Sequence, residues 1–253
     1  MRLLFLGTGT SQGVPVIACH CEVCRSSQRF DRRLRTSAIL KTDAGKNILF
    51  DIGPDFRQQM LTHGVEHLDA ILVTHAHRDH VAGLDEIRSF NYIQHKKMDV
   101  YLNDIASHAL QRDYRYIFAP HEYPGLPEAD LHEVDAPFEA AGETIVPIHV
   151  MHKDLPILGF RIGDLAYITD ANQIHPDELN KLKGVKTLVI NALRKEKHFS
   201  HYSLPEAIDV VGQIAPQKAY LTHISHEMGL HDCVQAELPD NIYLAYDGLE
   251  VEV

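Results

Sequence analysis

A run of six residues, His75-Ala76-His77-Arg78-Asp79-His80, concentrates metal-binding side chains in one short segment. Three imidazoles and a carboxylate suit zinc, manganese or iron. In extended backbone, residues i and i+2 point the same way, so His75 and His77 can reach one ion, and a following turn can direct Asp79 and His80 to a second. A solvated loop would explain any one of these histidines. It does not explain all four residues together, so the run predicts a metal site.

A second group of ligand types lies near the N-terminus, where Cys19, Cys21 and Cys24 supply three thiols within six residues. A closed structural zinc site needs four ligands, and we take His226 as the candidate for the fourth. The alternative is a set of three reduced, buried thiols. Cys233 has no partner in this scheme and is expected to be a small core residue.

The histidine run is expected on a loop between a strand and a helix. Residues 70–73 form a short apolar run typical of a buried strand, and the run follows its C-terminal end. Residues 55–64 have apolar side chains at helical spacing before that strand. The other expected strands are 2–6, 38–40, 47–50, 100–102, 144–150, 159–162, 166–169, 187–191 and 218–221, and the other expected helices are 106–116 and 204–214.

Turn and loop signals separate these elements. Residues 119–130 are rich in Pro, Gly and acidic residues and are expected to form a loop, and Asp247-Gly248 is expected to join 242–246 and 249–253 into a hairpin. Strands in two series, each with helices, predict one α/β domain over residues 1–253. Its architecture is expected to be a four-layer αββα sandwich, two mixed β-sheets flanked by helices, with the ligands on loops at one edge.

The overall composition limits the partners. Lys and Arg number 24 against 35 Asp and Glu, and the net charge of −11 disfavours a long polyanion such as nucleic acid. A small phosphate ester is not disfavoured. We expect no membrane segment and a cytoplasmic protein, because no apolar run approaches the length of a membrane span.

The motif Thr74 to His80 resembles the H-x-H-x-D-H signature of the metallo-β-lactamase superfamily. The resemblance extends to Asp51-Ile52-Gly53, a strand-end Asp-x-Gly. It implies further ligands at His152, Asp170 and His223. His149 is a competitor for the first of these, and a helix N-cap is a rival use of Asp170.

Carried over to this chain, the resemblance implies two adjacent metal ions. One would be held by His75, His77 and His152 and the other by Asp79, His80 and His223, with Asp170 as a bridge. Asp51 would orient a ligand histidine.

A closer resemblance covers nearly the whole chain. Gly7-Thr8-Gly9, Gln12-Gly13-Val14-Pro15, the C-x-C-x-x-C clip and Leu221 to His226 recur in the same order in the PhnP-type phosphodiesterases of bacterial phosphonate breakdown, which open phosphoribosyl cyclic phosphate. This resemblance implies a structural zinc at the Cys19, Cys21, Cys24 and His226 group, beside two catalytic zinc or manganese ions.

The expected activity is hydrolysis of a small phosphodiester, cyclic or linear, by water that two metals activate. Similar enzymes keep a histidine that binds no metal before a helix, and His201 occupies that place as the expected proton donor, with Asp79 also counted as catalytic. His198 is expected to be a solvated surface residue. A tRNA 3′-end nuclease, a thioester or lactam hydrolase and a metal-binding scaffold are the alternatives. A homodimer is left open, and residues 95–135 are expected to set specificity.

Overall fold

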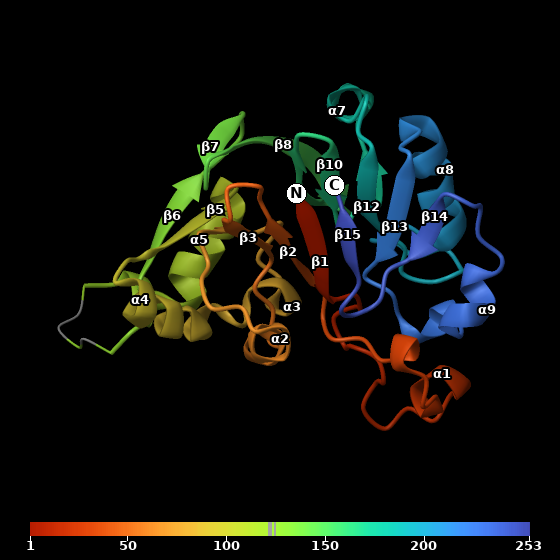
Figure 1. The fold of residues 1–253 in the computed structure, drawn as a ribbon, viewed down its shortest axis with the longest axis horizontal. Helices are drawn as coiled ribbons and strands as arrows, with labels where there is room; N and C mark the ends of the chain where they lie inside the picture. Colours follow the sequence, from red (N-terminus) through yellow and green to blue (C-terminus); the bar gives the residue numbers. More distant parts are fainter. Residues whose placement is uncertain (121–122, 124) are drawn as a thin grey trace.

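Two β-sheets face each other across a buried apolar layer (Figure 1). The structure is a computed structural model that describes residues 1–120, 123 and 125–253. Within those residues the first sheet has seven strands, in the order β15 (Glu250–Glu252), β1 (Arg2–Gly7), β2 (Ser37–Lys41), β3 (Asn47–Phe50), β4 (Ala70–Leu72), β5 (Met98–Leu102) and β6 (Ala129–Glu133). The second has the order β11 (Gln173–Ile174), β8 (Glu143–His152), β9 (Leu155–Ile162), β10 (Leu165–Ile168), β12 (Thr187–Asn191), β13 (Lys218–Thr222) and β14 (Ile242–Leu244), and β7 (Phe138–Ala140) pairs with β8.

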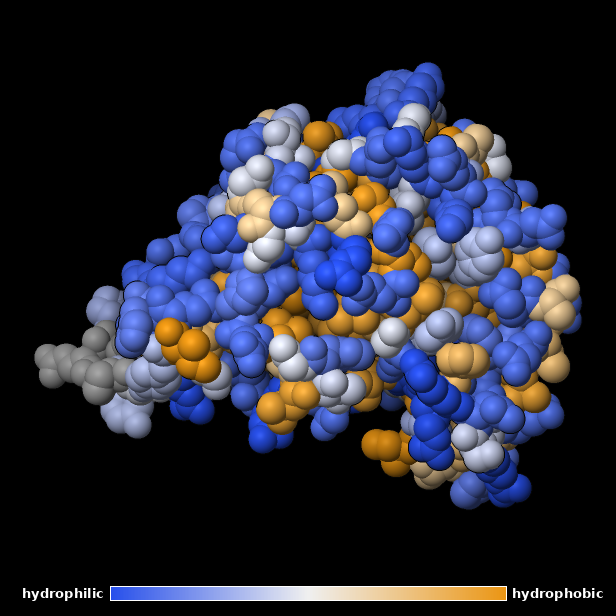
Figure 2. All heavy atoms as spheres, in the orientation of Figure 1, coloured by the Kyte–Doolittle hydropathy of each residue, from blue (hydrophilic) through white to orange (hydrophobic). Residues whose placement is uncertain are grey.

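Alternation along the strands builds three apolar layers. On β1, Leu3 and Phe5 face the second sheet, where they join Phe160 and Tyr167. Leu4 and Leu6 face outward, under the helices of the first sheet. Strands buried on both faces carry continuous apolar runs for this reason. Figure 2 shows hydrophilic side chains over much of this face, with apolar ones gathered in the middle of the view, between the two sheets. The predicted four-layer αββα fold is confirmed.

The helices cover the outer faces of the two sheets. Those associated with the first sheet are α2 (Phe56–His63), α3 (Arg78–Val81), α4 (Arg88–Gln94), α5 (Asp104–Asp113) and α6 (Arg115–Phe118), with the 3-10 helix η2 (Leu84–Ile87). Those associated with the second are α7 (Pro176–Lys181), α8 (Leu204–Ile214) and α9 (His231–Gln235). The short elements α1 (Glu22–Arg25), η1 (Arg29–Asp31) and η3 (His226–Met228) lie in the N- and C-terminal loops. Among the described residues, no helix is long and apolar enough to cross a membrane.

Two of the predicted loop regions differ from the structure. The predicted C-terminal hairpin is wrong, because β14 lies parallel to β13 in the second sheet and β15 lies antiparallel to β1 in the first. Asp247 in the intended turn instead accepts hydrogen bonds from the Thr8 hydroxyl at 2.8 Å and the Leu34 amide at 2.7 Å, which ties it to loops of the first sheet. The predicted loop over 119–130 ends early, since β6 begins at Ala129, where it pairs with β5. Residues 121, 122 and 124 of that loop lie outside the described residues.

Candidate metal centre

Parallel strands bring the predicted ligands to one edge. The pairs β3–β4 and β10–β12–β13 are parallel, so their carboxyl ends lie together in each sheet. Asp51 directly follows β3, Asp170 comes shortly after β10 and His223 directly follows β13. These three residues have φ values of 58°, 63° and 56°, a left-handed conformation that costs a non-glycine residue about 1 kcal/mol or more. Such backbone turns the side chains off the strand ends toward one another.

The first ligand group joins both sheets. Nitrogens of His75, His77 and His152 lie within 4.8 Å of one another, as a shared ion would require. His152 donates through Nδ1 to the carbonyls of Asp170 at 2.7 Å and Ser200 at 2.9 Å, so its Nε2 carries the lone pair. His149, the competitor, instead lies with its Nε2 3.1 Å from the Asp135 carbonyl, and the cluster excludes it.

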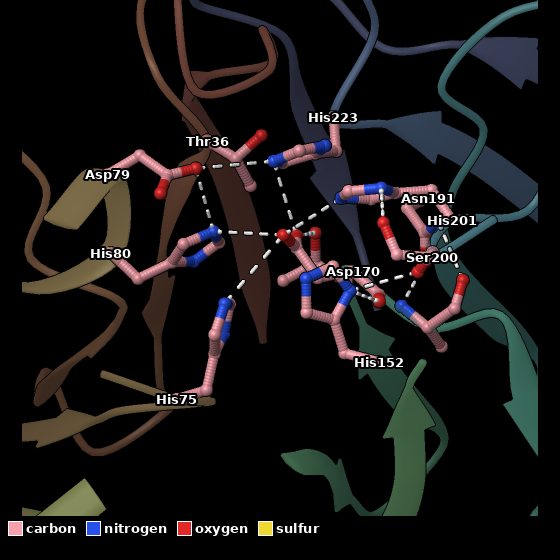
Figure 3. A network of polar contacts seen from close by, with 12 residues as sticks. Thr36, His75, Asp79, His80, His152, Asp170, Asn191, Ser200, His201 and His223 are labelled. Carbon is pink, nitrogen blue, oxygen red and sulfur yellow. Dashed lines mark hydrogen bonds and ion pairs between the residues drawn. The ribbon is translucent and has the colours of Figure 1, made fainter. Parts of the chain in front are cut away.

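The second ligand group is centred on Asp170 (Figure 3). One Asp170 oxygen lies 3.3 Å from Nε2 of His80, and the other lies 3.3 Å from Nε2 of His223. Asp79 approaches the same two nitrogens at 3.2 and 3.5 Å. Asp170 also lies 3.8 Å from Nε2 of His75, so this carboxylate stands between the two groups, where a bridge is needed.

The carboxylate of Asp170 does not cap a helix. The next element is the two-residue strand β11, and Ala171 donates its amide to the Asn191 side chain at 2.8 Å. The N-cap interpretation of Asp170 is therefore wrong.

The protonation states of the first ligand group and of Asp170 suit cation binding. Burial lowers the pKa of His75 well below its usual value and also lowers the pKa values of His77 and His152, which keeps these nitrogens free as ligands. Burial opposes ionisation of Asp170, but His223 and His80 outweigh it and hold the pKa of Asp170 well below its ordinary range.

The residues therefore fit divalent metal ions. Nε2 of His75 and Nε2 of His80 are buried without a hydrogen-bond partner in the described structure, although burying a polar atom unpaired is costly. Both nitrogens face the carboxylate of Asp170, and a cation between them would satisfy all three groups.

Asp51 supports ligands of both groups. It is fully buried and accepts from His80 Nδ1 at 2.7 Å and from the Thr74 hydroxyl at 2.9 Å. Because that hydroxyl donates to Asp51, its oxygen accepts from His75 Nδ1 at 3.0 Å. The carboxylate thus fixes the ring of one histidine directly and of another through Thr74, as the sequence motif implied for one of them.

His201 reaches the centre from the segment before α8. Its Nε2 lies 3.2 Å from Asp170, and its Nδ1 lies 3.0 Å from the Ser200 hydroxyl and 3.3 Å from Nδ1 of His198. The prediction that His198 is a solvated surface residue is wrong, since it is half-buried against His201. Sequence reasoning also missed Thr74 and Ser200. The adjacency of Thr74 to His75 and of Ser200 to His201 was the available signal.

The cysteine group forms a separate centre between α1 and η3. Sulfurs of Cys19 and Cys21 lie 3.4 and 3.3 Å from Nδ1 of His226, and all four predicted ligands lie within 4.8 Å. The amide of Cys24 donates to Cys21, which with His226 lowers the pKa of Cys21 to about 6. Burial raises the pKa of Cys24 to about 11. Of the three thiols Cys24 alone is buried, contrary to the alternative of three buried thiols.

Cys233 is not a core residue. It is exposed on α9, where the buried positions are His231 and Val234, so the helix turns this thiol to the outer side. That prediction is wrong.

Comparisons with known proteins agree with this geometry. A family model described as a beta-lactamase superfamily domain matches residues 46–224. An octanoyltransferase of Porphyromonas gingivalis is 46% identical over 253 residues, which are 99% of this chain and 51% of that protein. The chain thus spans about half the length of that relative. A coenzyme PQQ synthesis protein B of Methylobacterium nodulans is 28% identical over 221 residues, 76% of this chain and 72% of that protein.

Solved structures are similar over the whole chain. A new diphosphatase from the PhnP family has a TM-score of 0.92 and 37% identity, over 100% of this chain and 97% of that one, which bears out the resemblance to that family. The short form of human tRNase Z has a TM-score of 0.74 and 17% identity, over 100% and 99%, and at that identity it shows the fold alone. The chain therefore belongs to the β-lactamase superfamily and has its metallo-hydrolase fold.

Proposed function

We propose that the chain is a dinuclear metal-dependent hydrolase of small phosphodiesters, some of them cyclic. The observation that carries the proposal is the pair of ligand groups that adjoin at Asp170. His75, His77 and His152 would hold one ion, Asp79, His80 and His223 the other, and Asp170 both. Zinc and manganese both suit imidazole and carboxylate ligands.

The chain's own residues would organise the reaction around those ions. When bound, two divalent metals supply a nucleophile from water at neutral pH and neutralise charge on the phosphoryl oxygens. Asp51 holds His80 and, through Thr74, His75 in the orientation that presents Nε2. Ser200 and Asp170 hold the ring of His152 through their carbonyls. The rings cannot then turn away as charge develops.

His201 is proposed to give a proton to the leaving oxygen. Its Nε2 faces the centre and its Nδ1 is held by Ser200, so the ring is aimed without an obligatory metal contact. A ring nitrogen of His201 lies within 4.8 Å of ligand atoms of His152 and Asp170, so a ligand role is the competing hypothesis. Metal content and leaving-group dependence separate the two.

The substrate is proposed to be small. The net charge of −11 opposes a long polyanion, which argues against tRNA processing despite the shared fold. The similar PhnP-family protein is a diphosphatase, which supports a phosphate substrate.

An acyl ester or thioester hydrolase is the second candidate. It is favoured by the 46% identity to a protein named octanoyltransferase, half of whose length this chain spans. Two metals that polarise a phosphoryl oxygen can also polarise a thioester carbonyl.

The Cys19, Cys21, Cys24 and His226 group is proposed to hold a structural zinc. Three thiolates and one imidazole make a closed set of four, with no position for substrate. Such a zinc would tie the N-terminal loop to the C-terminal one. Residues 1–253 would act as a single domain.

Metal counting with a substrate panel tests these proposals. Protein expressed without added metal should contain about three ions per chain, two catalytic and one structural. The panel would include a cyclic phosphodiester, bis(p-nitrophenyl) phosphate and an octanoyl thioester. Turnover of the phosphodiesters alone supports the main proposal, and turnover of the thioester alone supports the second candidate. Active enzyme with one ion or fewer would exclude the dinuclear site.

A further inference from the structure

A pocket of about 530 Å³ opens beside the first ligand group. His75 and His77 line its inner end, so a substrate held at the metal centre would extend its non-reacting part into this space. One wall comes from α5 and the other from the start of β9, at Leu155 and Pro156. Pockets of this size hold most of a small organic molecule.

The two walls are fixed to each other by Asn103. Its side-chain oxygen accepts from the Ala106 amide at 2.8 Å and so caps α5, and its side-chain nitrogen donates to the Pro156 carbonyl at 3.2 Å. One residue therefore sets both the start of the helix and its distance from β9. The pocket is preformed, and filling it costs little ordering.

Apolar side chains from three segments line the pocket among polar ones. Ile105 and Ala109 lie one helical turn apart on α5, and Ala76, Leu155 and Pro156 line the same pocket. Ile105 is 42% exposed, so part of this apolar side chain faces water. An apolar occupant would remove it from water.

Charged groups of α5 also line the pocket and disfavour an anionic substituent there. Asp104, His108 and Arg112 recur every four residues along the helix. Arg112 is paired with Asp113 at 2.8 Å and so does not neutralise Asp104. A second anionic group on the substrate is therefore disfavoured in the pocket, whereas its apolar side chains favour an apolar group.

We infer that this pocket binds an apolar alkyl chain of the substrate, next to the bond that is broken. The inference rests on the proposed function, because it takes the metal centre as the place where the substrate's head group binds. The alkyl chain would run along Ile105 and Ala109. Beyond Ile105 the adjoining surface is acidic, at Glu133 and Asp135, which limits how long a chain gains from binding.

Binding of alkylphosphonates by calorimetry tests the inference on the metal-containing protein as purified. Each buried methylene is worth about 0.8 kcal/mol, so Kd should fall roughly three- to fourfold per methylene from methyl to about hexyl, and the heat capacity change should become more negative. Equal Kd values from methyl to hexyl, or no detectable binding of hexylphosphonate, would overturn the inference.

Two variants and a control test whether the alkyl chain binds in this pocket. Ala109→Leu fills the pocket with a good helix former and should abolish the gain per methylene while leaving methylphosphonate binding unchanged. Ile105→Asn, at a partly exposed wall position, should reduce the gain even if the first variant folds poorly. Gln111→Leu adds apolar bulk to an exposed site of α5 outside the pocket and should keep the full gain. If both pocket variants keep the wild-type dependence of Kd on alkyl length, the alkyl chain binds elsewhere.

Phosphodiester turnover separates this inference from the proposed function. Chain-length-dependent phosphonate binding without turnover of any phosphodiester would support the pocket and refute the function. Phosphodiester turnover without chain-length-dependent phosphonate binding would support the function and refute the pocket.

Discussion

Replacing Asp51 with asparagine exchanges one carboxylate oxygen for an amide nitrogen and tests how the metal ligands are oriented. Asparagine tolerates the left-handed backbone at this position, where φ is 58°, so the chain path should persist. Oδ1 accepts from the Thr74 amide at 2.8 Å, and the amide oxygen can keep that bond. The amide nitrogen then faces Nδ1 of His80 and the hydroxyl of Thr74.

That nitrogen donates where the carboxylate accepted. His80 must then accept at Nδ1 and carry its proton on Nε2, the atom that faces Asp79 and Asp170. In this tautomer Nε2 of His80 has no free lone pair for a metal ion. Removing an orienting partner usually costs 10- to 100-fold in metal affinity, about 1.4–2.7 kcal/mol. We expect the upper end for the ion at His80 and a smaller loss for the ion at His75, which Asp51 reaches only through Thr74.

Metal titration against a chromophoric chelator measures both affinities. Asp69→Asn is the matched control, because Asp69 is also a partly buried carboxylate that accepts a backbone amide, that of Asn47, but lies at the opposite end of β3 and β4. It should bind both ions as the wild type does. If Asp51→Asn also keeps both affinities, the orienting role assigned to Asp51 is refuted.

Three further perturbations have defined outcomes. His201→Ala should keep full metal content and lose about 10²- to 10⁴-fold in turnover on an ester with a poor leaving group. The loss should be smaller when p-nitrophenolate is the leaving group, and His198→Ala should lose less turnover than His201→Ala. Loss of metal from His201→Ala would make His201 a ligand. Cys21→Ser should release one zinc and lower Tm without affecting the catalytic ions, and unchanged Tm and zinc content would contradict the structural site. Burial raises the pKa of Asp247 to about 6, above the value near 4 of an unfolded chain, so its stabilising contribution is complete below about pH 4 and is lost as pH rises through 6. The free energy of unfolding, measured with denaturant between pH 4 and 7, should fall less with rising pH in Asp247→Asn than in the wild type. The same pH dependence in both proteins would refute this.

The ligand set could be predicted because its members lie at strand ends in a recurring order. His75 to His80 follow one apolar run, in the first sheet, and His223 follows another, in the second. Parallel pairing aligns the strand ends within each sheet, and the packing of the two sheets brings the two sets of ends together. No local sequence pattern predicted the hydrogen bonds of Asp247. Its acceptor bonds to Thr8 and Leu34 join segments more than 200 residues apart, so a short-range turn signal gave the wrong pairing.

Side-chain surroundings were harder to predict than ligand identity. His198 was expected in solvent, but its Nδ1 lies 3.3 Å from the Ser200 hydroxyl and 3.3 Å from Nδ1 of His201. That residues 95–135 set specificity stays a prediction, and α5, which lines the proposed pocket, lies within them. That pocket depends on Asn103 meeting Pro156, a contact across 53 residues that follows from the packing of the two sheets.

The left-handed backbone at Asp51, Asp170 and His223 has an evolutionary consequence. Glycine would adopt these φ values without strain, and a neutral side chain at position 51 would remove the cost of burying that carboxylate, whose pKa burial raises. The metal-free fold would therefore gain stability from replacements that destroy the centre. Where a lineage no longer needs the activity, these three positions should be among the first to drift, and glycine or asparagine there would mark a relative that keeps the sandwich but has lost its chemistry.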